Sequence, residues 1–212
     1  MRISIIYDNT AYDTQLKEDW GFAALIETDN KNILFDTGAN GAILLSNMQK
    51  LKISPDELNT IFISHAHWDH TGGLKDILAE NNNVDLWIPP SFHFHGNVKN
   101  IHDPETPATI SEGVHTTGEL EGIEQSLCVE TSKGIVVIVG CAHPDMKNII
   151  HTASRFGTVY AVIGGMHGTQ PHLLEAPELI CPTHCTQHKT EMKNLYPDNF
   201  IEGGAGRVIE IE

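Results

Sequence analysis

The segment from residue 63 to residue 74 reads ISHAHWDHTGGL and concentrates four potential metal ligands within six positions: His65, His67, Asp69 and His70. They follow an apolar stretch that is typical of a buried strand. Burying three imidazoles and a carboxylate without partners would be costly, and a merely solvated loop has no need for so many histidines. Imidazole and carboxylate favour Zn, Mn or Fe over Mg or Ca, which prefer all-oxygen ligands. The pattern therefore predicts a metal site.

One loop cannot complete a coordination shell, so further ligands are expected elsewhere in the chain. Three later stretches share an apolar run, small residues and then a histidine: VVIVGCAH, YAVIGGMH and LICPTH, which end at His143, His167 and His184. A single histidine at a strand end is a weak signal, since it often makes only a structural hydrogen bond. Three such histidines downstream of the first cluster predict convergence at one edge of the fold.

Other polar motifs have structural interpretations. CPTHC at 181–185 lacks the second cysteine pair of a four-ligand zinc site, so its cysteines are interpreted as small buried residues. FHFH at 92–95 is expected to contact substrate or solvent. GGAG at 203–206 is interpreted as a turn, because no helix follows it to bind a phosphate.

Composition and charge narrow the function classes. The chain has 212 residues, 40% hydrophobic and 19% charged, which predicts one globular domain over residues 1–212. The start lacks a basic region followed by a long apolar stretch, and no apolar run is long enough to span a bilayer, so a cytoplasmic location is expected. Four cysteines do not form a disulfide framework.

The formal net charge of −15 argues against a nucleic-acid partner and against an anionic membrane surface. Bound divalent cations can still make one pocket positive on an acidic protein. The 13 histidines equal Lys and Arg combined. A small-molecule substrate is therefore the expected partner, and the sequence does not indicate an oligomeric state.

Periodicity predicts the elements that position these ligands. Residues 2–38 resemble a three-stranded β-meander, a helix begins near Gly41, and SPDE at 54–57 has the residues of a capped helix start. The segment from 90 to 116 is rich in Pro and His and is expected to be an irregular excursion over the site. The remaining elements are strands at 60–64, 84–89, 123–131, 134–140, 158–165 and 206–212, and helices at 72–80, 145–157 and 186–196. Runs of strands separated by single helices predict two sheets packed face to face with helices outside.

On these residues, the chain resembles the metallo-β-lactamase superfamily, whose hallmark is the H-x-H-x-D-H loop. ILFDTG at 33–38 resembles another family motif. Within the superfamily the chain is most similar to a branch of small metal-dependent hydrolases labelled after a dihydropterin ribofuranosylaminobenzene-phosphate synthase, through YDNT, WGFAALIE, VGCAHPDMKNII, IGGMHG and PTHCT. The resemblance covers essentially the whole chain and implies an α/β fold, a four-layer αββα sandwich of two mixed β-sheets flanked by helices.

The resemblance also implies roles for individual residues. One metal ion would be held by His65, His67 and His143, and a second by Asp69, His70 and His184. Asp36 would support the metal loop by accepting a hydrogen bond. The two ions would be divalent, with Zn favoured and Mn or Fe as alternatives.

The chain departs from many superfamily hydrolases at one position. Where they carry an aspartate that bridges both metals, this chain has Gly164, Gly165 and Met166 before His167. His167 is then either a ligand to one metal or a residue that lines the pocket. It is also a candidate for protonating the leaving group, with Asp69 orienting the nucleophile.

The expected activity is hydrolysis of an ester or phosphoester bond, including a phosphodiester, in a small anionic metabolite by a metal-bound hydroxide. A non-catalytic metal or ligand sensor is the alternative from another class, and a redox or synthase member of the superfamily also stays open. Di-iron redox members carry Glu where this chain has His67, and sulfur oxygenases use the aspartate that it lacks. Nuclease members would need a basic tract.

Overall fold

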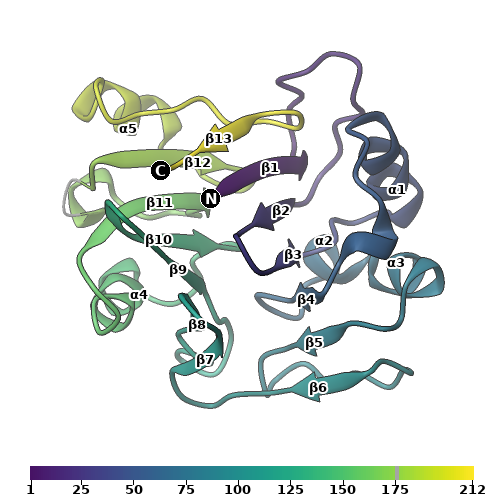
Figure 1. The fold of residues 1–212 in the computed structure, drawn as a ribbon. Helices are drawn as coiled ribbons and strands as arrows, with labels where there is room; N and C mark the ends of the chain where they lie inside the picture. Colours follow the sequence, from purple (N-terminus) through teal and green to yellow (C-terminus); the bar gives the residue numbers. More distant parts are fainter. Residues whose placement is uncertain (175–176) are drawn as a thin grey trace.

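The computed structural model, which describes residues 1–174 and 177–212, contains two β-sheets packed face to face (Figure 1). Neighbouring strands of the first sheet are, in spatial order, β13 (Val208–Glu210), β1 (Arg2–Tyr7), β2 (Ala23–Glu27), β3 (Asn32–Phe35), β4 (Thr60–Phe62), β5 (Asp85–Trp87) and β6 (Asn100–His102). Those of the second are β12 (Leu179–Thr183), β11 (Val159–Gly165), β10 (Gly134–Val139), β9 (Leu127–Thr131), β8 (Val114–Thr116) and β7 (Ala108–Ser111).

Each sheet mixes antiparallel and parallel pairs. In the first, β13, β1, β2 and β3 pair antiparallel, whereas β3, β4, β5 and β6 are parallel. In the second, β10, β11 and β12 are parallel, and β7, β8, β9 and β10 are joined by antiparallel pairs. The carboxyl ends of neighbouring parallel strands share one edge of a sheet, so the residues that follow them are brought together.

Helices cover the outer faces of the two sheets (Figure 1). The helices α1 (Gly41–Lys50) and α3 (Leu74–Glu80) lie against the first sheet, and α4 (Met146–Ala153) and α5 (Lys189–Leu195) against the second. Short helical turns are α2 (Trp68–Thr71), η1 (Pro55–Glu57) and η2 (Pro171–Leu174).

Alternation of side chains along the strands produces three apolar layers. The layer between the sheets includes Ile3, Phe35, Phe62, Val136 and Ile163, all fully buried. The opposite faces of the same strands form two further clusters under the helices. The predicted four-layer αββα sandwich of two mixed sheets is confirmed.

Some sequence-based expectations about local structure were wrong. The segment from 90 to 116 is not a wholly irregular excursion, because its second half forms β6, β7 and β8, which extend both sheets at their edges. Phe92 and Phe94 pack against the apolar cluster under α1 and α3, while His93 and His95 are exposed. A short helix begins at Pro55, as SPDE predicted, but it is a 3-10 helix in which the Ser54 side chain makes no capping hydrogen bond.

The two ends of the chain lie side by side (Figure 1). The amino group of Met1 donates to the Ile211 carbonyl oxygen at 2.9 Å. No helix in the described parts of the chain is both long enough and apolar enough to cross a bilayer.

Candidate metal centre

The candidate ligands lie on loops that follow the carboxyl ends of strands from both sheets. The H-x-H-x-D-H segment follows β4 and continues into α2. The loops after β10, β11 and β12 carry His143, His167 and His184 respectively. Because β10, β11 and β12 are parallel neighbours, these three loops share an edge, as expected from the sequence.

Three histidines converge in the first group. His65 Nε2 lies 3.1 Å from His67 Nδ1, and His143 Nε2 lies 3.2 Å from the same His67 nitrogen. Two nitrogens held by one tetrahedral zinc at about 2.0–2.1 Å are about 3.3 Å apart. The observed spacing therefore suits a shared cation with little movement of the rings.

A second group combines Asp69, His70 and His184, which are all buried. The Asp69 Oδ2 atom is 3.2 Å from His184 Nε2 and 3.9 Å from His70 Nε2. The structure thus brings together the same two sets of three residues that the resemblance implies, with one nitrogen or oxygen of each residue facing its partners.

Hydrogen bonds accepted by Asp36, directly from His70 and through Ser64 for His65, orient two of the imidazole rings. Asp36 Oδ2 accepts from Ser64 Oγ and from His70 Nδ1, both at 2.7 Å, and Oδ1 accepts from the Ser64 backbone N–H. Because Ser64 Oγ gives its hydrogen to Asp36, it accepts from His65 Nδ1 at 2.9 Å. The Nε2 lone pairs of His65 and His70 therefore point into the centre, as in ligands of a cation.

Asn9 orients the third ring in the same way. Its Oδ1 atom accepts from His184 Nδ1 at 2.9 Å and from the Gly21 backbone N–H at 3.0 Å. His184 Nε2 is buried and has no hydrogen-bond partner among the described residues, although the carboxylate of Asp69 faces it. A cation between these two acceptors would satisfy both of them in the buried site. The residues present fit divalent metal ions.

Burial shifts the pKa values of these groups. It raises the pKa of the Asp36 carboxyl to about 8, and the positive charge of cations beside His65 and His70 would act in the opposite direction. It lowers the pKa of His65 to about 2 and that of His70 to about 3, so both rings stay neutral and able to ligate. Burial opposes ionisation of Asp69, but contact with His184 brings the pKa of this carboxyl below its usual range.

Backbone strain concentrates at the same place. Six non-glycine residues in the described parts of the chain have positive φ, and four of them flank the centre: Asp36, Ala142, His167 and His184. Such conformations cost about 1–3 kcal/mol each and persist only where the surroundings enforce them. The loops are therefore shaped for the positions of these side chains rather than for lowest backbone energy.

Glu124 fixes the loop that carries His143, and the sequence analysis missed it. Its side chain is buried, and Oε1 accepts from the backbone N–H groups of Gly140, Cys141 and Ala142 at 2.9–3.1 Å. Oε2 accepts from the backbone N–H of His143 at 3.0 Å. A Cβ on Gly140 would lie 2.1 Å from Ser64 Oγ, so only glycine allows the loop to approach Ser64.

Three further supporting residues lie near the chain start, where the sequence offered motifs without roles. Asp8, in YDNT, is fully buried and accepts from the His184 backbone N–H at 2.6 Å. Asn9 belongs to the same motif. Trp20 donates its indole N–H to Asp69 Oδ2 at 2.8 Å and packs edge-on against His184. The signal was a polar run directly after a buried strand.

His167 lies on one side of the centre rather than between the two groups. It is exposed, its ring centroid is 5.0 Å from that of His143, and its ring nitrogen lies within 4.8 Å of candidate ligand atoms of Cys141 and His143. His143 and His167 line an open cleft of about 300 Å³ together with Pro144, Thr169 and Leu173. The cleft is therefore formed by the loops after β10 and β11, not by residues 90–116.

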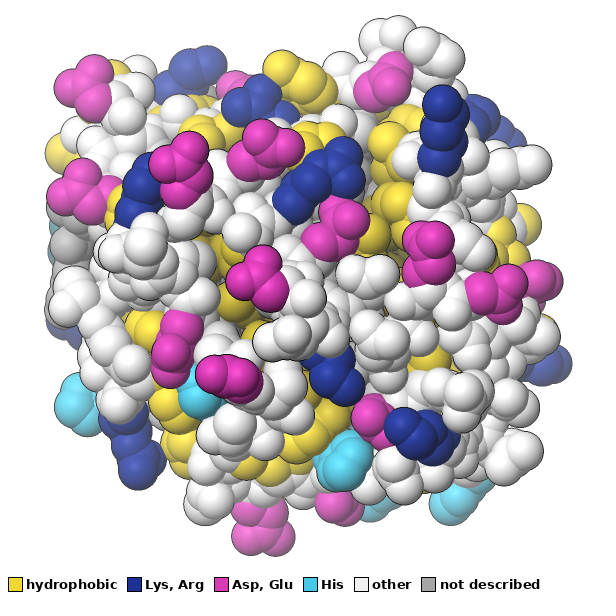
Figure 2. Space-filling model, viewed as in Figure 1, with side chains coloured by type: hydrophobic (Ala, Val, Ile, Leu, Met, Phe, Trp, Pro, Cys, Tyr) yellow, Lys and Arg dark blue, Asp and Glu magenta, His cyan; other side chains and the backbone are white. Residues whose placement is uncertain are grey.

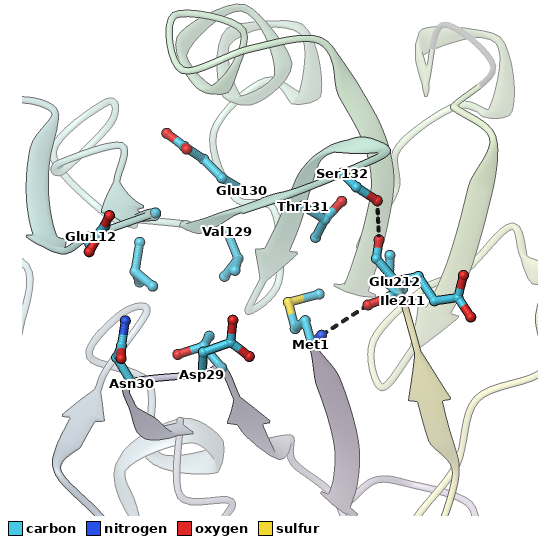
Figure 3. A pocket seen from close by; sticks show the side chains of 13 residues that line it. Met1, Asp29, Asn30, Glu112, Val129, Glu130, Thr131, Ser132, Ile211 and Glu212 are labelled. Carbon is cyan, nitrogen blue, oxygen red and sulfur yellow. Dashed lines mark hydrogen bonds between the residues drawn. The ribbon is translucent and has the colours of Figure 1, made fainter.

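A larger cavity of about 490 Å³ lies elsewhere (Figure 3). It is lined by the chain ends and by the turns after β2, β7 and β9, including Asp29, Glu112 and Glu130. Ser132 donates there to the Glu212 carbonyl oxygen at 2.7 Å. None of the candidate metal ligands lines this cavity.

Comparison with known proteins identifies relatives along the whole chain. Residues 21–151 match a family model described as the metallo-beta-lactamase superfamily. The 7,8-dihydropterin-6-methyl-4-(beta-D-ribofuranosyl)-aminobenzene-5'-phosphate synthase of Methanocaldococcus jannaschii is 27% identical, over 96% of this chain and 94% of that protein.

Solved structures share the fold. Tm1679, described as a metal-dependent hydrolase of the beta-lactamase superfamily, aligns with a TM-score of 0.82 and 23% identity, covering 100% of this chain and 99% of that chain. Zn(2+)-bound PqqB from Methylobacterium extorquens aligns with a TM-score of 0.69 and 12% identity over 100% of both chains.

Proposed function

Because the chain belongs to the metallo-beta-lactamase superfamily, we propose that it is a metal-dependent hydrolase of an ester or phosphoester bond in a small anionic metabolite. One observation carries the proposal: ring nitrogens and a carboxylate oxygen converge in two groups of three, with the N–H groups of His65, His70 and His184 held outward by Ser64, Asp36 and Asn9. This orientation leaves the Nε2 lone pairs of the three rings free to ligate a metal ion.

In this proposal one divalent ion is held by His65, His67 and His143, and another by Asp69, His70 and His184. Nitrogen and carboxylate ligands at nearly tetrahedral spacing favour Zn, with Mn or Fe as alternatives. When bound, such ions supply Lewis acidity at the scissile bond and lower the pKa of water.

Residues of the chain itself would orient the attacking water and protonate the leaving group. Asp69 receives the Trp20 indole hydrogen bond, so its position stays fixed while it orients the attacking water. His167 is exposed beside His143 in the cleft, where it can give a proton to the leaving group. His143 is the residue through which the cleft and the metal centre meet.

The surroundings of the site favour a small substrate. The cleft of about 300 Å³ is open, and Trp20 and Trp68 are 51% and 63% exposed beside the ligands Asp69 and His67. The Trp20 ring offers apolar surface next to the ligands, and bound cations would attract an anion despite the net charge of −15. On the face drawn in Figure 2, basic side chains lie among acidic ones and form no continuous basic patch.

A synthase reaction is the second candidate function. It is favoured by the relative named as a dihydropterin-forming synthase, which aligns over nearly the whole of both chains. The same cations and the same acid and base would then activate a phosphorylated substrate for transfer to another acceptor than water. Product analysis separates the two reactions, because only hydrolysis incorporates oxygen from labelled water.

The test measures cleavage of carboxyl-ester, thioester, lactone and phosphodiester probes by protein loaded with Zn or Mn, with metal content determined on the same samples. Cleavage of one class is expected, and Asp69→Asn should abolish it. His95→Ala removes an exposed histidine that belongs to none of the ligand groups and serves as the matched control. Protein that carries two metals per chain and cleaves none of the probes would refute the hydrolase proposal.

A further inference from the structure

Cys141 lies at the centre of the candidate metal site, where no role has been assigned to it. Its side chain is buried, and Sγ is 3.2 Å from His70 Nε2. Sγ also lies within 4.8 Å of a ligand atom of His65, of His143 and of His184. It is therefore close to members of both groups of three, which no other cysteine in the described chain achieves.

We propose that the Cys141 thiolate is a metal ligand shared between the two metal positions, in place of the aspartate that this chain lacks after β11. The proposal rests on the metal occupancy proposed above. On binding, the S–H bond is broken, the proton passes to the solvent, and the sulfur forms a bond to each cation. Thiolate sulfur is among the commonest zinc ligands and binds at about 2.3 Å.

The contact with His70 supports this assignment. Since His70 Nδ1 donates to Asp36, its Nε2 lone pair faces Cys141 Sγ. A nitrogen and a sulfur bound to one tetrahedral zinc are about 3.6 Å apart, so a shift of a few tenths of an ångström from the observed 3.2 Å would admit the ion. The backbone of Cys141 is fixed by Glu124, which limits larger movement.

The structural alternative is a thiol that donates a weak hydrogen bond to His70. Cys128 and Cys181 show what a purely structural cysteine looks like in this fold, because both are fully buried in apolar clusters on β9 and β12. Cys141 differs from them, since ring nitrogens surround its sulfur. Cys185 lies near Cys141 but is only half-buried and belongs to a group with His184 alone among the six ligands.

Cobalt substitution tests the assignment. Wild-type protein loaded with Co²⁺ should bind two ions per chain and show the intense near-ultraviolet sulfur-to-cobalt charge-transfer band. Cys141→Ser should lose the band and bind metal at least 10-fold more weakly, because loss of an outer-shell partner alone already costs about 10- to 100-fold. Cys185→Ser and Cys128→Ala should keep the band.

The outcomes separate this proposal from the proposed function. Wild-type protein with two bound cobalt ions and no charge-transfer band would overturn the thiolate-ligand proposal and leave the hydrolase proposal unaffected. This outcome is measured on the wild type, so it does not depend on whether a variant folds. A band that survives in Cys141→Ser and disappears in Cys185→Ser would also overturn it. If the protein shows the band but hydrolyses none of the probes, the result supports Cys141 as a metal ligand and refutes the proposed hydrolase activity.

Discussion

Replacing Glu124 with Gln tests the idea that a buried carboxylate holds the loop of His143. Gln can keep its carbonyl oxygen at the Oε1 position, with three hydrogen bonds, but its amide group then faces the His143 N–H. The orphaned N–H costs about 1–3 kcal/mol, and three bonds that lose charge assistance cost about 1 kcal/mol each. Removing the buried charge offsets part of this loss of stability, because desolvation of the charge costs several kcal/mol in the folded wild type.

We therefore expect Glu124→Gln to lower the unfolding free energy by about 2–4 kcal/mol, which a protein with a typical stability of about 5–15 kcal/mol survives. Urea denaturation of metal-free protein measures it, so that metal loss does not contribute. Glu112→Gln, at an exposed position in the turn between β7 and β8, is the control and should change stability by less than about 0.5 kcal/mol. A loss below about 1 kcal/mol for Glu124→Gln would refute the reasoning.

The remaining predictions concern ligand orientation, pH and thiols. Asn9→Ala removes the acceptor of the His184 ring N–H and should weaken metal binding by about 10- to 100-fold in chelator competition; unchanged affinity would contradict the orienting role. Burial lowers the pKa of His65 to about 2 from 6.5, so metal-free protein should lose stability as pH falls below 6.5, by up to about 1.4 kcal/mol per pH unit for this residue. His70 acts in the same direction and Asp36, whose pKa burial raises to about 8, in the opposite one, so a net loss is still expected. A flat urea-denaturation profile down to about pH 4 would argue against it. Burial raises the pKa of both Cys128 and Cys181 to about 12, so neither should react with iodoacetamide in native protein, and peptide mass spectrometry showing native labelling of either would be inconsistent with the fold.

The sequence was most informative where chemistry and periodicity coincide. The spacing of His65, His67, Asp69 and His70 after an apolar strand allowed a metal site to be expected without coordinates, because few other arrangements tolerate such density of titratable groups. The positions of His143, His167 and His184 directly after apolar strands also predicted that these histidines lie at one edge of the fold. The two-sheet architecture followed from alternating runs of strands and helices.

Contacts between segments far apart in the chain were beyond the reach of sequence patterns. Glu124 supports a loop that begins 16 residues later, and Asp8 holds the backbone of a residue 176 positions away. Neither residue lies at a sequence spacing from the histidines that would identify it as part of the site. Both are recognised only once folding removes them from water, since a buried carboxylate must then find donors.

The prediction for residues 90–116 was wrong for a different reason. Its prolines and histidines suggested an irregular surface segment, but β6 and β7 are edge strands, each with one neighbouring strand among the described residues. Edge strands tolerate polar residues and nearby prolines, because one side of the backbone needs no partner. Composition alone therefore could not distinguish them from a loop.

Metal content per chain tests the central claim most directly. Protein reconstituted with excess Zn²⁺ and freed of unbound metal is analysed by native mass spectrometry, as wild type and as His143→Ala and His184→Ala. The account predicts two ions in the wild type and one in each variant, with His95→Ala unchanged at two. One ion or none in the folded wild-type chain would contradict a two-metal centre.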